Sequence, residues 1–207
     1  NMVGIHQQTI RMYEKEGFSP LNEFCREMAW YRDGELSFEK NFFAKADSSI
    51  RKLDWRDWGA LSALMCQPRG SRLRLVSLGV YGRMSMEKSF LALEQRIEQE
   101  YDALAFVLES EATGAAAGTA MLLADKRFPG NTLLDLFVHP NYSDQTGGLI
   151  ETLLSTTLYE RIQAYSDPDD VEKIRALENA GFHLSAVLEK QITLPTGSLD
   201  VLLYTRE

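Results

Sequence analysis

The sequence has little cysteine and no surplus of positive charge, and both shortages exclude functions. Its two cysteines, Cys25 and Cys66, stand far apart, with no Cys-x-x-Cys motif and no histidine cluster nearby. They are therefore interpreted as buried free thiols in a reducing cytosol, not as a disulfide framework or a zinc site. The 22 basic and 30 acidic residues give a net charge of −8, which argues against nucleic acid or an anionic membrane as a partner. A cationic substrate such as an amine is compatible with this charge.

Long apolar runs are also missing. The sequence shows neither a signal peptide nor an apolar run long enough to span a bilayer, so a cytoplasmic protein is predicted. The 44% apolar and 25% charged residues are typical of an ordinary globular protein, and 207 residues are enough for one full core and part of a second.

The stretch 131–154 carries the strongest pattern. Its apolar run, interrupted only by Asp135, predicts a strand buried on both faces. Pro140 ends this strand because proline has no N–H to donate to a sheet. A short polar loop with Gly147 and Gly148 then leads into a helix whose apolar residues keep helical spacing. A strand end, a glycine-bearing turn and a helix start bring free N–H groups and the positive end of a helix dipole to one point, which suits a phosphate.

The rest of the chain alternates helical and extended patterns. Asp54 is a good N-cap, and Gly17 and Gly181 are typical helix ends. The stretch 67–81 has no clear period, and the polar stretch up to Asp47 is interpreted as a linker. The patterns predict helices at 7–16, from 54 onward, at 86–100 and at 167–181, and strands at 18–24, 27–31, 49–53, 103–109, 115–124, 162–166, 182–192 and 199–205.

Two short segments echo each other at opposite ends of the chain. Residues 13–18 (YEKEGF) and 177–182 (LENAGF) each end a predicted helix at a glycine and lead into a strand. A possible internal repeat of this kind is considered first, because overlooking a repeat leads to a wrong fold assignment. A new series of strands and helices begins at about Ser48, which supports a repeat whose unit is a whole domain.

That element order, with a strand-V-x-P-loop-G-helix unit at its centre and the LENAGF ending, resembles the GCN5-related N-acetyltransferases. The resemblance implies a mixed α/β (α+β) fold with a bent, mostly antiparallel sheet flanked by helices on both faces. It covers residues 47–207 as a complete domain and residues 1–46 as the C-terminal remnant of a preceding domain plus a linker. The chain is therefore interpreted as the back end of a tandem protein.

The resemblance also implies acetyl-CoA as a co-substrate. In that family the strand end offers backbone groups to the pantetheine arm, and these residues would be Phe137 and Val138. The following (R/Q)-x-x-G-x-(G/A) turn wraps the pyrophosphate and corresponds to residues 145–150 (QTGGLI). The loop before it is about two residues too long for the pattern, and Ile150 stands where Gly or Ala would let the backbone come close. Turn contacts are expected from Gln145, Thr146, Gly147, Gly148 and Leu149.

The family's catalytic acid is a tyrosine on the last long helix, and that position holds Leu177, which cannot protonate a departing thiolate. The predicted general base is Asp135, with His139 as the local alternative and Glu109 and Glu111 at the hairpin as more distant ones. Each has a structural alternative: Asp135 can pair within the sheet, and His139 can simply lie on the surface.

Two functions follow. The first is an acetyl-CoA-dependent N-acyltransferase that acts on a primary amine of a small molecule or a peptide. The second is a degenerate, non-catalytic domain of the same fold with a structural, dimerisation or ligand-binding role. No metal site is expected. Residues 1–33 carry apolar side chains without a core of their own, so they are expected to pack on the complete domain or, alternatively, on a second copy of the chain in a homodimer.

Overall fold

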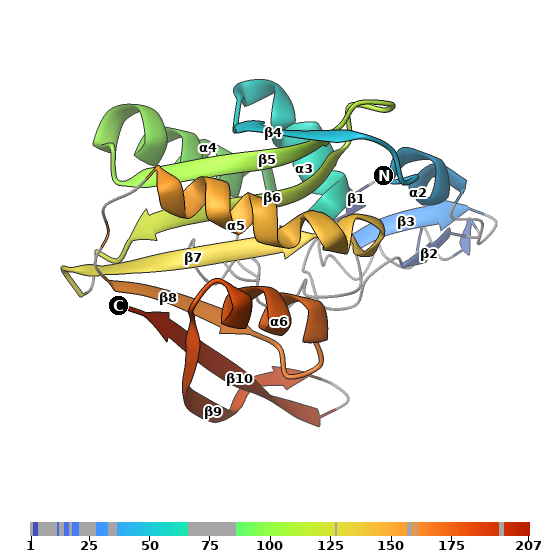
Figure 1. Cartoon of the computed structure of the whole chain (residues 1–207). Helices are drawn as coiled ribbons and strands as arrows, with labels where there is room; N and C mark the ends of the chain where they lie inside the picture. Colours follow the sequence, from blue (N-terminus) through green and yellow to red (C-terminus); the bar gives the residue numbers. More distant parts are fainter. Residues whose placement is uncertain are drawn as a thin grey trace.

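The computed structural model describes residues 2–3, 12, 15–16, 18–20, 28–32, 37–65, 86–126, 128–156, 159, 161–194 and 197–207. Most of the helix predicted at 7–16 lies outside these residues, as do the stretch 67–81 and both cysteines. Within the described residues the chain forms two sheets, and helices cover both faces of the larger one (Figure 1).

The larger sheet has seven strands in the order β4-β5-β6-β7-β8-β10-β9. Neighbouring strands run antiparallel, except β7 and β8, which are parallel. This confirms the predicted mixed, mostly antiparallel sheet, and every strand predicted from residue 49 onward is present. The strands are β4 (Ser48–Lys52), β5 (Ala103–Ser110), β6 (Ala116–Ala124), β7 (Asn131–Val138), β8 (Arg161–Ser166), β9 (His183–Leu194) and β10 (Gly197–Arg206).

The smaller sheet comes from the beginning of the chain. It consists of β1 (Met2–Val3), β2 (Phe18–Pro20) and β3 (Met28–Arg32) in the order β1-β3-β2, with both pairs antiparallel. The strands predicted at 18–24 and 27–31 overlap β2 and β3. The division of the chain into a remnant and a complete domain stays a prediction.

The helical segments begin at caps that the sequence pattern contains. Asp54 starts a capping box, because its carboxylate accepts the Arg56 N–H while the Asp57 carboxylate accepts the Asp54 N–H at 2.8 Å. Asp170 caps the last helix by accepting the Lys173 N–H at 3.4 Å. The segments are α2 (Ser37–Phe42), η1 (Trp55–Asp57), α3 (Trp58–Met65), α4 (Met86–Gln95), η2 (Arg96–Glu100), η3 (Pro140–Gln145), α5 (Thr146–Ser155) and α6 (Val171–Asn179).

The stretch before Asp47, interpreted from sequence as a linker, contains a helix and a core residue. Helix α2 occupies residues 37–42, and the Phe43 side chain that follows it is fully buried. Because most residues around Phe43 are polar, the sequence pattern does not reveal that Phe43 is a core residue. The segment is therefore part of the packed structure and not an extended connector.

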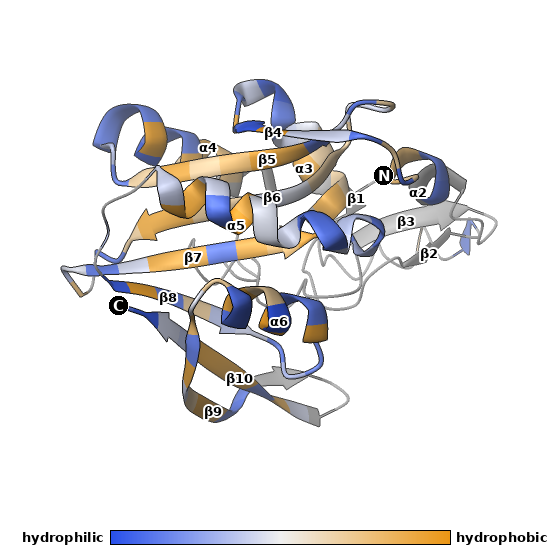
Figure 2. Cartoon of the chain, in the orientation of Figure 1, coloured by the Kyte–Doolittle hydropathy of each residue, from blue (hydrophilic) through white to orange (hydrophobic). Residues whose placement is uncertain are grey.

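Hydrophobic cores lie on both faces of the larger sheet, and β7 contributes to each. Leu134 and Leu136 pack with residues of α5 and α6 on the face that Figure 1 shows in front. Phe137 packs on the opposite face with residues of α3 and α4. Figure 2 shows the corresponding apolar colour concentrated on β5, β6 and β7. A strand covered on both sides needs apolar residues at nearly every position, as the pattern of β7 indicated.

We expect Phe43→Ala to lower the free energy of unfolding by about 3–5 kcal/mol, because it removes a fully buried ring and leaves a cavity. Phe128, 61% exposed, provides the control, and Phe128→Ala should change stability by less than about 0.5 kcal/mol. Denaturant unfolding of both variants measures the difference. Equal small effects would show that the segment before β4 is not part of the core.

Glu94 on α4 is a buried carboxylate in negative surroundings. Its side chain is 9% exposed, and its Oε1 atom accepts no hydrogen bond from the part of the chain that the structure describes. Burial raises the pKa of Glu94 above its ordinary value, and the negative charges of Glu98, Asp54 and Asp57 raise it further. The ionised side chain therefore destabilises the folded protein at neutral pH.

We expect Glu94→Gln to increase the free energy of unfolding at neutral pH, because it removes a charge that the folded state disfavours. A carboxyl group whose pKa is raised by folding penalises the folded state fully only above that raised pKa. The gain should therefore shrink as the pH falls through the raised pKa toward the ordinary glutamate value, and vanish below it. Urea unfolding at several pH values, with the exposed and distant Glu189→Gln as the control, measures the effect. A gain that is independent of pH would contradict the assignment.

Candidate functional site

The sheet opens between β7 and β8. Their parallel pairing runs from Asn131 and Arg161 to Leu134 and Ala164, where it ends. Beyond this pair, β8 continues beside β10 and β7 continues beside β6. The outer edge of the last four residues of β7 is therefore turned toward the gap between the strands, where it can bind an extended ligand through backbone groups.

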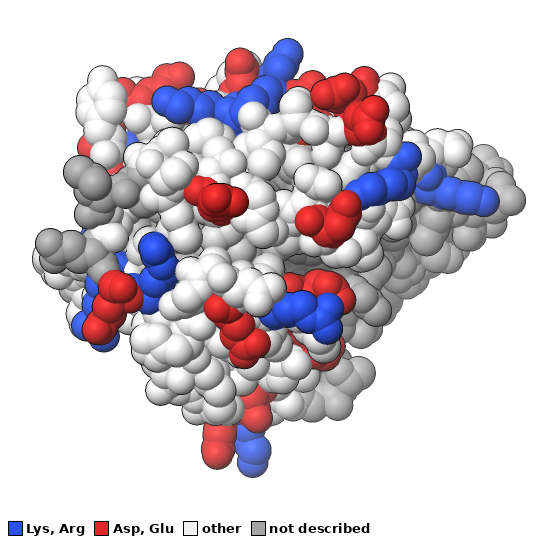
Figure 3. Space-filling model, viewed as in Figure 1, with Lys and Arg blue, Asp and Glu red and all other residues white. Residues whose placement is uncertain are grey.

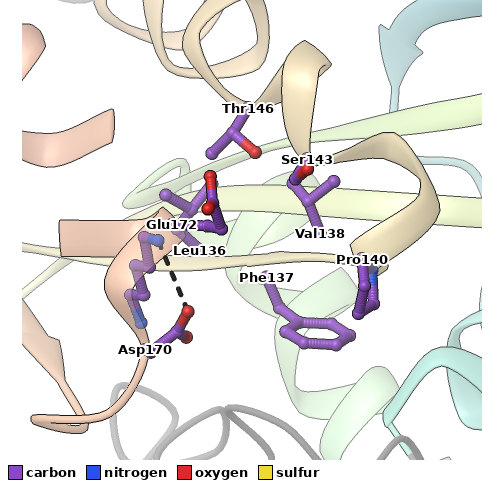
Figure 4. A pocket seen from close by; sticks show the side chains of 9 residues that line it. Leu136, Phe137, Val138, Pro140, Ser143, Thr146, Asp170 and Glu172 are labelled. Atoms are coloured by element: carbon purple, nitrogen blue, oxygen red, sulfur yellow. Dashed lines mark hydrogen bonds between the residues drawn. The ribbon is translucent and has the colours of Figure 1, made fainter. Parts of the chain in front are cut away.

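A cleft of about 190 Å³ lies at this opening. Figure 4 shows its walls, which come from the end of β7, the turn that follows it and the first turn of α6. The lining residues are Leu136, Phe137, Val138, Pro140, Ser143, Thr146, Asp170, Glu172 and Lys173. The predicted strand contacts Phe137 and Val138 and the predicted turn residue Thr146 thus meet in one cleft.

The segment between β7 and α5 is a helical turn and not the polar loop that the sequence predicted. η3 takes a 3-10 conformation because Pro140 favours a helical start and the His139 Nδ1 atom accepts the Asn141 N–H at 3.2 Å. η3 runs directly into α5, whose first residue, Thr146, donates its N–H to the Ser143 carbonyl. The predicted turn 145–150 therefore consists of the last residue of η3 and the first residues of α5.

Gly147 and Gly148 lie in the first turn of α5 and face open space. A Cβ atom on Gly147 would meet nothing within 4 Å, and one on Gly148 would meet only the Ile50 Cδ1 at 3.8 Å, an ordinary contact. Neither glycine has a positive φ, so neither backbone conformation nor internal packing requires glycine. The positive end of the helix dipole and a bare backbone surface coincide here, which is suited to an approaching anion.

The segment before β4 holds the turn in place. The Asn141 side-chain amide donates to the Phe43 carbonyl at 2.8 Å, and the fully buried Tyr142 donates its hydroxyl to the Ala44 carbonyl at 2.6 Å. The His139 ring stacks on the Phe43 ring with centroids 4.4 Å apart and planes 7° apart. Residues separated by almost half the chain thus fix the end of β7 and the start of α5.

The outer side of the turn carries an ion pair. The Lys45 ammonium donates a hydrogen bond to Asp144, which lowers the pKa of that carboxyl below its ordinary value. The same ammonium lies 5.0 Å from the centroid of the Tyr142 ring. Both members of the pair are about half exposed, so the pair adds little stability by itself.

Asp135, the predicted base, is the first residue of β7 beyond its last pairing with β8. It alternates with Leu134 and Leu136, so it lies on the α3 and α4 face together with Phe137. Its side chain is 4% exposed, and it does not line the cleft between β7 and α6. Its catalytic role stays a prediction.

The other predicted acid–base residues do not meet at the cleft. His139, the alternative base, is buried, so the surface position considered as its structural alternative is wrong. Glu109 forms ion pairs with Arg51 and Arg56 at the β4 edge of the sheet, and Glu111 is exposed in the β5–β6 turn. Leu177 of α6 is fully buried in the core that α5 and α6 form with the sheet.

Sequence reasoning missed the contribution of α6 to the cleft. Asp170, Glu172 and Lys173 line it, although their pattern was interpreted only as a helix start. The available signal was topological: α6 follows β8, so its first turn begins near the end of the splayed pair.

The described residues contain no group of three or more His, Cys, Asp or Glu side chains that can hold a metal ion together. None of the described helices combines the length and apolarity needed to cross a membrane.

No family model and no curated protein matches the sequence, but solved structures match its fold. An acetyltransferase of the GNAT family from Streptococcus pneumoniae has a TM-score of 0.59 at 18% identity, covering 77% of this chain and 99% of its own. A spermidine N-acetyltransferase from Vibrio cholerae in complex with CoA and spermine has a TM-score of 0.57 at 15% identity, covering 77% and 94%. A Salmonella typhimurium protein with its cofactor acetyl-CoA has a TM-score of 0.60 at 15% identity, covering 78% and 94%. The chain therefore has the GNAT acetyltransferase fold.

We expect Gly147→Ala and Gly148→Ala each to raise the free energy of unfolding by roughly 0.5–1 kcal/mol, because alanine favours the helix and neither methyl group meets a clash. Thermal or urea unfolding measures the change. The control is Gly181→Ala, since Gly181 has a φ of +84° and alanine there should destabilise the protein. Destabilisation at 147 or 148 would show that the start of α5 needs glycine for folding.

Proposed function

We propose that this protein is an acetyl-CoA-dependent N-acyltransferase that acetylates a primary amine. The observation that carries the proposal is the open edge of β7 facing a cleft that Thr146, the first residue of α5, also lines. Gly147, the next residue, lines a neighbouring cleft between α5 and α6. The GNAT fold supports the same function, and the neighbour named as a spermidine N-acetyltransferase supports an amine as the acceptor class.

The residues present fit acetyl-CoA at this place. Backbone groups of Phe137 and Val138 would hold the pantetheine arm, and the Gly147 and Gly148 backbone would approach the pyrophosphate. The Leu149 side chain is fully buried, so Leu149 can contribute only through its backbone. The cleft of about 190 Å³ is smaller than whole ligand pockets, which suits the arm alone and leaves the nucleotide end outside.

The remaining turn residues point away from the β7 cleft. Gln145 is half-buried at the end of η3, its side-chain amide donates to the Asp144 carboxylate at 3.1 Å, and it lines a separate cleft beside Lys45. Ile150, which departs from the family pattern, is fully buried in the core, so its side chain does not obstruct the ligand face of α5.

Acetyl-CoA would supply the activated acetyl thioester. The protein would orient the thioester and accept one proton from the acceptor nitrogen. The acceptor nitrogen forms a bond to the carbonyl carbon, the C–S bond breaks with its electron pair left on sulfur, and the nitrogen loses a proton. Asp135 is the proposed base for that proton, because it lies where β7 leaves β8 and on the face opposite α5 and α6. An acceptor would therefore enter from the α3 and α4 side.

A non-catalytic domain is the second candidate, and three observations favour it. The first N–H of α5 is already used by the Ser143 carbonyl, Leu177 is a core residue, and Asp170 and Glu172 place negative charge at the cleft. Figure 3 shows acidic and basic side chains interspersed on the face that carries α5 and α6, and no broad basic surface marks the site for a nucleotide.

Isothermal titration of acetyl-CoA into the protein tests the proposal. We expect saturable binding that Gly148→Trp abolishes, because the indole fills the space beside the start of α5. Gly59→Trp is the matched control, since Gly59 also lies in the first turn of a helix and faces open space. Binding that survives Gly148→Trp would move the site elsewhere, and failure of the parent protein to bind would overturn the proposal.

A thiol-release assay with a panel of primary amines separates the two candidate functions. Turnover that falls by on the order of 10²-fold or more in Asp135→Asn supports catalysis with Asp135 as the base. Binding without turnover supports the non-catalytic domain. Turnover that Asp135→Asn leaves unchanged would remove Asp135 from the mechanism while keeping the enzyme.

A further inference from the structure

Lys173 is the one cation among the described residues that line the cleft. Six of its eight companions are uncharged, and the other two, Asp170 and Glu172, are negative. Lys173 as a whole is 8% exposed, but its Nζ atom is not among the fully buried atoms without a partner. Its aliphatic stem is therefore packed in the wall of the cleft while its ammonium stays accessible.

The position of Lys173 in α6 is fixed by the helix start. Asp170 caps α6 by accepting the Lys173 backbone N–H at 3.4 Å, which places Lys173 at the third residue of the helix (Figure 4). Leu177 lies four residues later on the same helix face and is anchored in the core. The core contact of Leu177 thus orients the face from which Lys173 reaches the cleft.

We propose that Lys173 stabilises the thiolate that leaves when acetyl-CoA is consumed; this rests on the proposed function. Breaking the C–S bond leaves the electron pair on sulfur, and a negative charge then develops inside a narrow cleft whose remaining charged groups are carboxylates. The Lys173 ammonium would act as the counter-charge to this thiolate. The proton released by the acceptor nitrogen goes to the base on the other face.

The surroundings of Lys173 determine what the test must control. The charged groups facing it are Asp170 and Glu172 of its own helix, while β7 and the turn present Leu136, Val138, Ser143 and Thr146. The matched control is Lys52→Met, because Lys52 is exposed on β4 outside the cleft. Lys173→Met removes the charge and keeps the length, and Lys173→Arg keeps the charge.

Binding of CoA and of S-methyl-CoA across a pH series tests the role without knowledge of the acceptor. For the parent protein we expect CoA affinity to rise with pH as the bound thiol ionises, roughly tenfold above that of S-methyl-CoA at alkaline pH. The ultraviolet absorbance of the bound thiolate should appear at lower pH than for free CoA. Lys173→Met should lose both effects, whereas Lys173→Arg and the control Lys52→Met should keep them.

The outcomes separate the two proposals. If neither ligand binds the parent protein, the proposed function fails and this role fails with it. If both bind equally at every pH, the proposed function stands and the role of Lys173 is overturned. If Lys173→Met weakens both ligands equally, Lys173 contacts phosphate rather than sulfur, and the thiolate role is again overturned. Where turnover is measurable, kcat of Lys173→Met should fall by on the order of 10²-fold with KM little changed.

Discussion

The ending of the β7–β8 pairing at Leu134 and Ala164 is the constraint on which the site depends. Up to that pair β7 is a central strand with a neighbour on each edge, and beyond it one edge is turned to the cleft. Peptide groups at such an edge need a partner, so the sheet creates a binding surface simply by ceasing to pair. The turn and α6 then enclose that surface, because they follow the two strands that separate.

The enclosure depends on residues far away in the sequence. The Asn141 and Tyr142 side chains donate hydrogen bonds to the carbonyls of Phe43 and Ala44, and the His139 ring stacks on the Phe43 ring. The start of α5 is therefore positioned by the segment that precedes β4, and a change in that segment reaches the cleft through packed side chains. Phe43 links the two directly, since its ring belongs to the core on the α3 and α4 face.

Charge sets the balance between the two candidate functions. The protein carries a net charge of −8, and the cleft has two carboxylates against one ammonium. This field attracts a cationic amine and repels the phosphates of a nucleotide, so the helix start and its bare glycines must supply the attraction for an anion. The same field makes Lys173 more important, because its ammonium offsets the negative charge of Asp170 and Glu172 in the cleft.

The sequence alone determined the order of the strands from β4 onward, the buried character of β7, the cap at Asp54, and the glycines at the start of α5. Each of these depends on a local period or on one residue's backbone chemistry, which neighbouring residues reveal. Only the tertiary structure decided where the β7–β8 pairing ends, that Phe43 is a core anchor, that His139 is buried, and that Lys173 lines the cleft. These features depend on contacts between segments distant in the chain, and no local pattern encodes which side chains such contacts bring together.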